Sequence, residues 1–175
     1  LWQGQCNCPY WHGVFGGLYL HHLRRSTYEH LIRSEEICDF RAGQKGPTFF
    51  EEDLNQDGAN ETVIDSSPFS FYFLPHRGGS LAELDFRPQA MNVLDTLTRR
   101  EEAYHGDLVK KPAPGETQGK SIHDLQKNVS PEVLERLAFD RWNRLSFLDH
   151  FLPLETTLED FWKSRFRSLV KDPTR

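Results

Sequence analysis

The 175 residues provide room for one domain with a sizeable core, or for one small domain and a piece of another. The net charge of −5 and the isoelectric point near 5.9 offer no basic surface, which excludes nucleic acids and anionic membranes as expected partners. No apolar run approaches the roughly 18 residues of a membrane span, and no charged start with an apolar run marks a signal peptide.

The three cysteines are an odd number, and their spacing fits neither a disulfide framework nor a zinc site. They are Cys6, Cys8 and Cys38. We therefore expect reduced thiols and a cytoplasmic location.

The segment 5–17 combines amides, thiols, an imidazole, three aromatic residues and glycines. Aromatic faces cover the apolar side of a sugar ring, amides and imidazoles bind its hydroxyls, and glycines let the backbone come close. This predicts a sugar-binding site whose candidate residues are Asn7, Tyr10, Trp11 and His12. The alternative, equally open, is that Tyr10, Trp11 and Phe15 form the buried face of a helix start.

Apolar residues then recur at helical steps from Leu20 to Cys38, with charged residues between them, which predicts an amphipathic helix. Three histidines lie along it, and we interpret them as solvated because no carboxylate follows at a ligand spacing. They are His21, His22 and His30. The polar stretch 39–47 predicts a boundary between a helical piece, residues 1–40, and a second domain, residues 48–175.

After this boundary the period of the apolar pattern changes to two, which is typical of a half-buried antiparallel sheet. The expected strands are Thr48–Glu52, Thr62–Asp65, Phe69–Leu74 and Leu81–Phe86. Phe69, Phe71 and Phe73 share one face, which we expect to be core. The sequence thus predicts an α+β fold, mainly β: an antiparallel β-sandwich preceded by a helical segment.

The C-terminal third predicts little regular structure. Residues 110–120 contain prolines, glycines and lysines and indicate an exposed loop. Ser130 followed by Pro131 predicts the start of a short helix that ends near Leu137. Thr157 and Asp160 loosely match a capping box before a last helix.

Oxygen-bearing side chains alternate between positions 53 and 61, with Gly58 at the sharp bend, an arrangement that can wrap a calcium ion. The candidate ligands are Asp53, Asn55, Asp57 and Glu61. Ile64 occupies the position where a full calcium loop has its bidentate glutamate, so we expect weak binding. The alternative is a polar hairpin turn built on Asp57 and Gly58. No cofactor is required, and calcium is the candidate ligand.

A retaining glycosidase needs two carboxylates about 5–5.5 Å apart. Five of the 26 acidic residues are candidates, but no motif pairs any two of them, and solvated or ion-paired carboxylates are the simpler interpretation. They are Asp85, Asp95, Glu102, Asp140 and Asp149. We therefore predict no catalytic residue in this chain.

The segment 5–20 resembles the last conserved motif of the glycoside hydrolase family 57 α-amylases and 4-α-glucanotransferases. The matching residues are Gln5-x-Asn7-x-x-Tyr10-Trp11-His12-Gly13 and Phe15-Gly16-Gly17-x-Tyr19-Leu20. The likeness continues in Gly78-Gly79-x-Leu81-x-Glu83-Leu84-Asp85, in Asn92-x-x-Asp95 through His105, and in Asp149-His150-Phe151-Leu152. It covers most of the chain. Some relatives have an acidic residue at the position of Cys8.

This resemblance implies a partial, galactose mutarotase-like β-sandwich that follows a catalytic barrel absent from the chain. It also implies a retaining enzyme acting on α-1,4-glucan or maltooligosaccharides, with both catalytic carboxylates in the barrel. The chain would then be a fragment that supplies contacts at the rim of the substrate cleft. The alternative is a non-catalytic carbohydrate-binding or structural β-sandwich module. The sequence does not distinguish hydrolysis from glucan transfer, and it does not indicate the oligomeric state.

Overall fold

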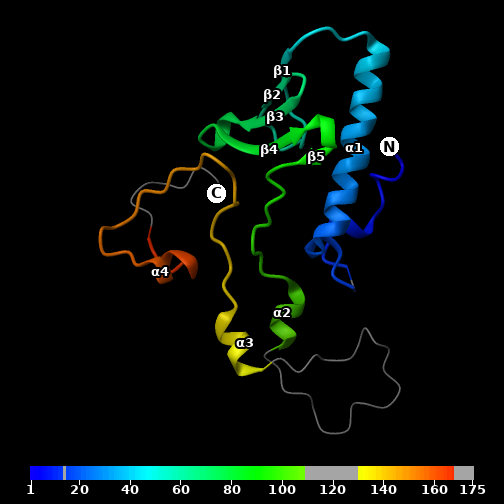
Figure 1. Cartoon of the computed structure of the whole chain (residues 1–175). Helices are drawn as coiled ribbons and strands as arrows, with labels where there is room; N and C mark the ends of the chain where they lie inside the picture. The colour runs from blue at the N-terminus through cyan, green and yellow to red at the C-terminus, as the bar shows by residue number, and fades with distance from the viewer. Residues whose placement is uncertain (14, 109–129, 168–175) are drawn as a thin grey trace, which may run out of the picture. The chain divides into compact units, whose positions relative to one another are not determined.

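The computed structural model describes residues 1–13, 15–108 and 130–167. Its contacts divide the chain into two compact units. The first comprises residues 1–97 and 144–150, and the second comprises residues 98–143 and 151–167 of the described chain. The first unit holds the long helix and the sheet (Figure 1).

The predicted amphipathic helix is α1, His21–Ala42. It is longer at its C-terminal end than expected, because the helix continues through Asp39–Ala42 until Gly43 adopts a left-handed conformation (φ 69°). There the Gly43 N–H bonds to the carbonyl groups of Asp39 and Phe40. Ile32 is 2% exposed and anchors the buried face of the helix.

Five antiparallel strands form one sheet in sequence order: β1 Thr48–Glu52, β2 Glu61–Asp65, β3 Phe69–Leu74, β4 Ser80–Phe86 and β5 Met91–Asn92. The four predicted strands are confirmed within one residue at each end. The two-residue β5 was not predicted, because so short a strand carries no period. The α+β fold class with an antiparallel sheet is confirmed, and the described residues form a single sheet.

The two sides of the sheet differ in chemistry. Strand pairing places Val63 opposite Tyr72, Ser70 opposite Asp85, and Asp85 opposite Asn92. We call this side, which faces α1, the helix side: Glu35 of α1 lies within electrostatic range of Asp65 and Asp85, and Tyr28 of α1 shares a side-chain hydrogen bond with Asn92. Val63, Ser70, Asp85 and Asn92 are all buried.

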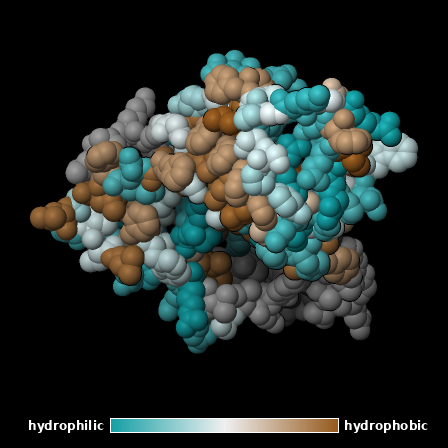
Figure 2. Space-filling view, turned by 45° about the horizontal axis from the view of Figure 1, so that its top comes forward, coloured by the Kyte–Doolittle hydropathy of each residue, from teal (hydrophilic) through white to brown (hydrophobic). Residues whose placement is uncertain are grey.

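The opposite side, here called the phenylalanine side, carries Phe69, Phe71, Phe73 and Phe86. Ring centroids lie 6.0 Å apart between Phe69 and Phe71, 6.2 Å between Phe71 and Phe73, and 5.2 Å between Phe69 and Phe86. The predicted stripe therefore exists, but its rings are half-buried, whereas full burial was expected of core residues. The space-filling view shows hydrophobic surface beside hydrophilic surface (Figure 2).

The second unit contains three short helices: α2 Ala103–Leu108, α3 Pro131–Arg136 and α4 Leu158–Trp162. The predicted helix starts are confirmed: Ser130 occupies the N-cap position of α3 without a side-chain cap hydrogen bond, and Thr157 caps α4 in a complete capping box with Asp160. The rings of Trp142, Phe161 and Phe166 pack together with centroids 5.3–5.4 Å apart. Within this unit Arg99 pairs with the buried carboxylate of Asp140 at 2.5 Å.

The loop predicted over residues 110–120 lies outside the described residues. Among the described helices, none combines the length and apolarity that crossing a membrane requires. The domain boundary expected in the stretch 39–47 stays a prediction.

Candidate functional site

The N-terminal segment folds into two short 3-10 helices, Cys8–Tyr10 and Gly17–Tyr19, before α1 begins. Pro9 favours the first of them, since its fixed φ suits the first turn of a helix. Gly17 allows the second: its φ is +46°, and a Cβ atom there would lie 2.1 Å from the carbonyl oxygen of Trp11. Only glycine permits this approach, and the Leu18 N–H then donates to the same oxygen at 2.9 Å.

The predicted sugar-binding residues are open to solvent on this scaffold. Tyr10 is 58% exposed and Trp11 is 40% exposed, while Asn7 is exposed and His12 is half-buried. The Trp11 and His12 rings meet edge to face with centroids 5.0 Å apart. Phe15 is 79% exposed, so the alternative that these aromatics form a buried helix face is not supported within the described chain.

Arg24 ties this segment to the rest of the first unit. Its Nη1 donates to the Leu18 carbonyl oxygen at 2.6 Å, and its Nε donates to Asp95 Oδ1 at 2.7 Å. The side chains of Arg24 and Asp95 are each 13% exposed, so the ion pair is shielded from water. The orientation of the aromatic segment thus depends on an arginine from α1 and a carboxylate from beyond β5, which no local sequence pattern connects.

The predicted calcium loop between β1 and β2 closes on its own amides. The Asp53 carboxylate accepts from Asp57 N–H and Gly58 N–H at 3.0 Å each, and Asn55 Oδ1 accepts from Asp57 N–H at 2.8 Å. Asp57 in turn accepts from Ala59 N–H at 3.0 Å, and this bond lowers the pKa of Asp57. These hydrogen bonds are those expected of a polar turn, the alternative to a calcium loop. They also engage the same oxygens that calcium would bind.

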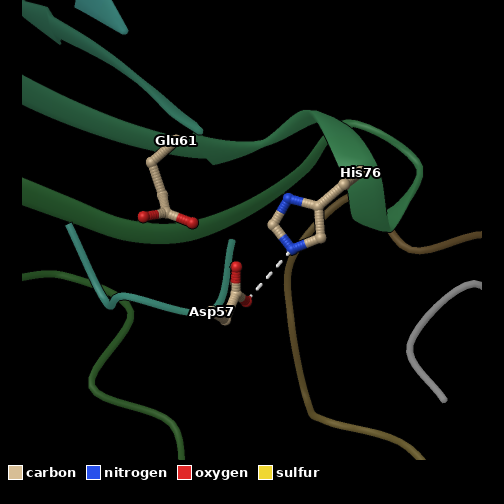
Figure 3. Close-up of side chains that lie close together, drawn as sticks. All are labelled: Asp57, Glu61 and His76. Carbon is tan, nitrogen blue, oxygen red and sulfur yellow. Dashed lines mark ion pairs between the residues drawn. The ribbon is translucent and has the colours of Figure 1, made fainter. Parts of the chain in front are cut away.

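Two of the four predicted ligands come together with a residue that the sequence did not indicate. Carboxylate oxygens of Asp57 and Glu61 and a ring nitrogen of His76 all lie within 4.8 Å of one another (Figure 3). His76 comes from the 3-10 turn Pro75–Arg77 after β3, and its Nε2 lies 3.5 Å from Asp57 Oδ2. Glu61 is 4% exposed and also accepts from Leu54 N–H at 2.9 Å. Asp53 is not part of this cluster.

A second group of carboxylates, missed by the sequence analysis as a group, lies on the helix side of the sheet. Burial raises the pKa of Glu83 to about 9, and Asp85 adds to the rise through its charge and a hydrogen bond. Burial likewise raises the pKa of Asp85 to about 6 and, with the charges of Asp85 and Asp65, that of Glu35 to about 7. Asp85 is 1% exposed, so its carboxylate is closed to a polymeric substrate.

Comparison with known proteins assigns these features to one family. Residues 53–172 match the family described as alpha-amylase/4-alpha-glucanotransferase, C-terminal, and residues 1–38 match its middle domain. The chain belongs to this alpha-amylase/4-alpha-glucanotransferase family, which confirms the resemblance found in the sequence.

Individual relatives agree with this assignment. The chain is 42% identical over 168 residues to alpha-amylase 1 of Dictyoglomus thermophilum, which covers 95% of the chain and 24% of the relative. It is 40% identical to a 4-alpha-glucanotransferase of Thermococcus kodakarensis, with coverage of 95% and 25%. The crystal structure of the 4-alpha-glucanotransferase from Thermococcus litoralis superposes with a TM-score of 0.77 at 34% identity, over 97% of the chain and 24% of that protein. The chain thus spans about a quarter of the length of these relatives.

Proposed function

We propose that the chain is the cleft-rim and β-sandwich portion of a longer, retaining enzyme that acts on α-glucans such as maltooligosaccharides, by hydrolysis or by glucan transfer. Asn7, Tyr10, Trp11 and His12 contact the substrate in this proposal, and the enzyme is cytoplasmic. The catalytic carboxylates belong to another part of the polypeptide.

One observation carries this proposal: the indole of Trp11 is exposed beside an imidazole, and the Trp11 carbonyl oxygen lies so close to Gly17 that no side chain fits there. Sugar sites pair such an aromatic face with directional polar groups. Membership of a family whose named relatives are alpha-amylases and 4-alpha-glucanotransferases supports the choice of an α-glucan as the ligand.

The test is Trp11→Ala in the complete polypeptide, with Trp2→Ala as the matched control because Trp2 is 89% exposed. Stacking of an indole on a sugar ring contributes about 1–3 kcal/mol, so turnover of maltooligosaccharides or affinity for them should fall by about one to two orders of magnitude. The melting temperature should hardly change. A large loss of thermal stability with unchanged affinity per folded molecule would refute the assignment of Trp11 to the substrate site.

The same proposal predicts that the 175-residue chain alone releases no reducing sugar and transfers no glucan. The measurement is a reducing-sugar and chain-length assay on the purified chain. Activity that persists after a mock-purified control would show that the chain carries its own catalytic groups.

We also propose that the loop from Asp53 to Glu61 binds calcium weakly. The proximity of the Asp57 and Glu61 oxygens supports this proposal. We expect low affinity for calcium because backbone amides within the loop compete for the same oxygens. Millimolar calcium should raise the melting temperature of the wild type, and Asp57→Ala should remove this effect.

Glu52→Ala, an exposed carboxylate of β1, is the matched control and should keep the calcium effect. His76→Ala should also keep it, because calcium prefers oxygen ligands. An unchanged melting temperature together with no calorimetric heat in excess calcium would contradict calcium binding, and loss of the effect in His76→Ala would show that His76 contributes to the calcium effect.

A further inference from the structure

We propose that the first unit holds a second sugar-binding site, separate from the Trp11 segment, in a cavity between α1 and β5 that takes one glucosyl unit of an α-glucan. The proposal rests on the proposed function for the identity of the sugar. The cavity has a volume of about 360 Å³. This lies near the lower end of the roughly 300–1,000 Å³ typical of small-molecule sites.

The cavity is lined by side chains of two kinds. Polar groups come from His21 and Arg25 of α1 and from Asn92 and Asp95, in β5 and just beyond it. Apolar surface comes from the ring of Tyr28 and from residues 91, 93 and 94. An aromatic and aliphatic wall with a few directional polar groups is the usual composition of a site for a small neutral ligand.

Two buried polar atoms of the lining lack a hydrogen bond among the described residues. Arg25 Nη1 has no acceptor, although Arg25 Nη2 donates to the Gln89 carbonyl oxygen at 3.4 Å. Asp95 Oδ2 has no donor, whereas Asp95 Oδ1 accepts from Arg24. Buried polar groups are nearly always satisfied, and each one left without a partner costs about 1–3 kcal/mol. Both atoms belong to residues that line the cavity, so a ligand that supplies the opposite of each would satisfy them once the two side chains turn toward it.

The two unpaired atoms select the class of ligand. Because Arg24 already pairs with Asp95 Oδ1, charge alone does not decide, but an anion would leave Asp95 Oδ2 without a donor and a cation would leave Arg25 Nη1 without an acceptor. A hydroxyl group both donates and accepts, so neighbouring hydroxyls of a sugar can bind Arg25 Nη1 and Asp95 Oδ2 without introducing a charge. His21, whose Nε2 lies 3.6 Å from Asp95 Oδ2 and whose side chain is 75% exposed, is on the solvent side of the pair.

The backbone holds Asp95 in place for this role. Asn92 is 6% exposed, and its Oδ1 accepts from Leu94 N–H at 2.9 Å and from Asp95 N–H at 3.2 Å. Asp95 itself has a φ of +26°, a left-handed conformation that non-glycine residues rarely adopt. Strain of this kind is concentrated at functional sites, where the surrounding contacts maintain it.

The experiment measures binding of maltotriose to the complete polypeptide by calorimetry, in the wild type and in Arg25→Gln and Asp95→Asn. Asp95→Asn keeps an oxygen acceptor for Arg24, but the Arg24–Asp95 pair also positions the Trp11 segment, so Arg25→Gln, which leaves that pair intact, is the decisive variant. The matched control is Arg33→Gln, an exposed arginine of the same helix that pairs with Glu29 at 3.2 Å. We expect two classes of maltotriose site in the wild type. In both test variants, affinity at one class should fall at least about tenfold, since hydrogen bonds to charged groups contribute this much.

Trp11→Ala separates this proposal from the proposed function. If Trp11→Ala removes one class and Arg25→Gln the other, both proposals hold. If Arg25→Gln weakens binding and Trp11→Ala does not, the cavity holds and the rim assignment fails. Wild-type affinity and stoichiometry in both Arg25→Gln and Asp95→Asn overturn the cavity site, as does binding of inorganic phosphate in place of maltotriose.

A direct structural measurement covers the case in which a variant unfolds. If the melting temperature of either variant falls well below that of Arg33→Gln, crystals of the wild-type polypeptide soaked in maltotriose decide the question. Electron density for a glucosyl ring against Arg25 and Asp95 supports the site, and ordered water alone in the cavity overturns it.

Discussion

On the helix side of the sheet polar groups are buried, whereas on the phenylalanine side large aromatic rings stay partly exposed. This is the reverse of what the chemistry of the two sides predicts. The helix side holds charged and hydroxyl groups such as Ser70 and Asp85, which are 0% and 1% exposed, because α1 covers them. The phenylalanine side holds large aromatic rings that remain half-buried. Residue type alone therefore does not locate the core of this chain, because the element that covers each side decides which residues are buried.

The largest effect should come from the apolar anchor of the covered side. Ile32→Ala should lower the free energy of unfolding by about 2–5 kcal/mol, because Ile32 is 2% exposed and its removal leaves a cavity beneath α1. Ile37→Ala is the matched control on the same helix, at 58% exposure, and should cost little. Urea denaturation of both variants checks this, and equal losses would show that α1 does not cover the sheet.

The next effect is a dependence of stability on pH that belongs to the helix side. In the folded chain the pKa values of Asp85, Glu35 and Glu83 are about 6, 7 and 9, above the ordinary 3.8 for Asp and 4.5 for Glu. The folded state therefore keeps protons that the unfolded state has released. The contribution of these three groups to stability should be complete below about pH 4 and should fall as the pH rises through their folded pKa values toward 9.

Glu83→Gln should flatten this decline and stabilise the chain at pH 8–9 by about 2 kcal/mol or more, since a neutral amide needs no proton to remain buried. Melting temperatures between pH 5 and pH 9 measure the effect. Glu52→Gln, an exposed glutamate of β1, should follow the wild type. A wild-type melting temperature that rises from pH 5 to pH 9 would contradict the raised pKa values.

The smallest effect should come from the phenylalanine side. Phe71→Leu should cost only about 1 kcal/mol in the isolated chain, because the ring is half-buried and Leu retains much of its apolar area. Denaturation midpoints compare it with Ile32→Ala. A loss as large as that of Ile32→Ala would mean that this side is fully packed, as the sequence alone suggested.

Local sequence patterns predicted the four longer strands, α1, α3 and α4, but neither β5 nor α2, because a local pattern needs a period or a capping signal. Phe69–Leu74 alternates over six residues, and Ser130 and Thr157 precede helices as capping residues do. The segment 5–17 was found by its unusual composition. Its exposure was not predictable, since the same aromatics suit a core.

The groups that depend on pairing between distant segments were not predictable. His76 joins Asp57 and Glu61 only because the turn after β3 lies beside the β1–β2 loop. Likewise, Arg25 and Asp95 line one cavity because β5 lies against α1, although β5 has only two residues and no recognisable pattern. A single sequence provides no register for such contacts.

The strand order has a consequence for how quickly the chain folds. Each of the first four strands pairs with the one that follows it in sequence, so every pairing closes a short loop. Short loops carry a small entropic cost, and chains rich in local contacts fold fast. Docking of α1 onto β5 instead joins segments about fifty residues apart or more. It also buries the carboxylates on the helix side of the sheet. We therefore expect the meander to form first and the helix to dock last, with substitutions in β2 and β3 slowing folding and substitutions in α1 mainly speeding unfolding.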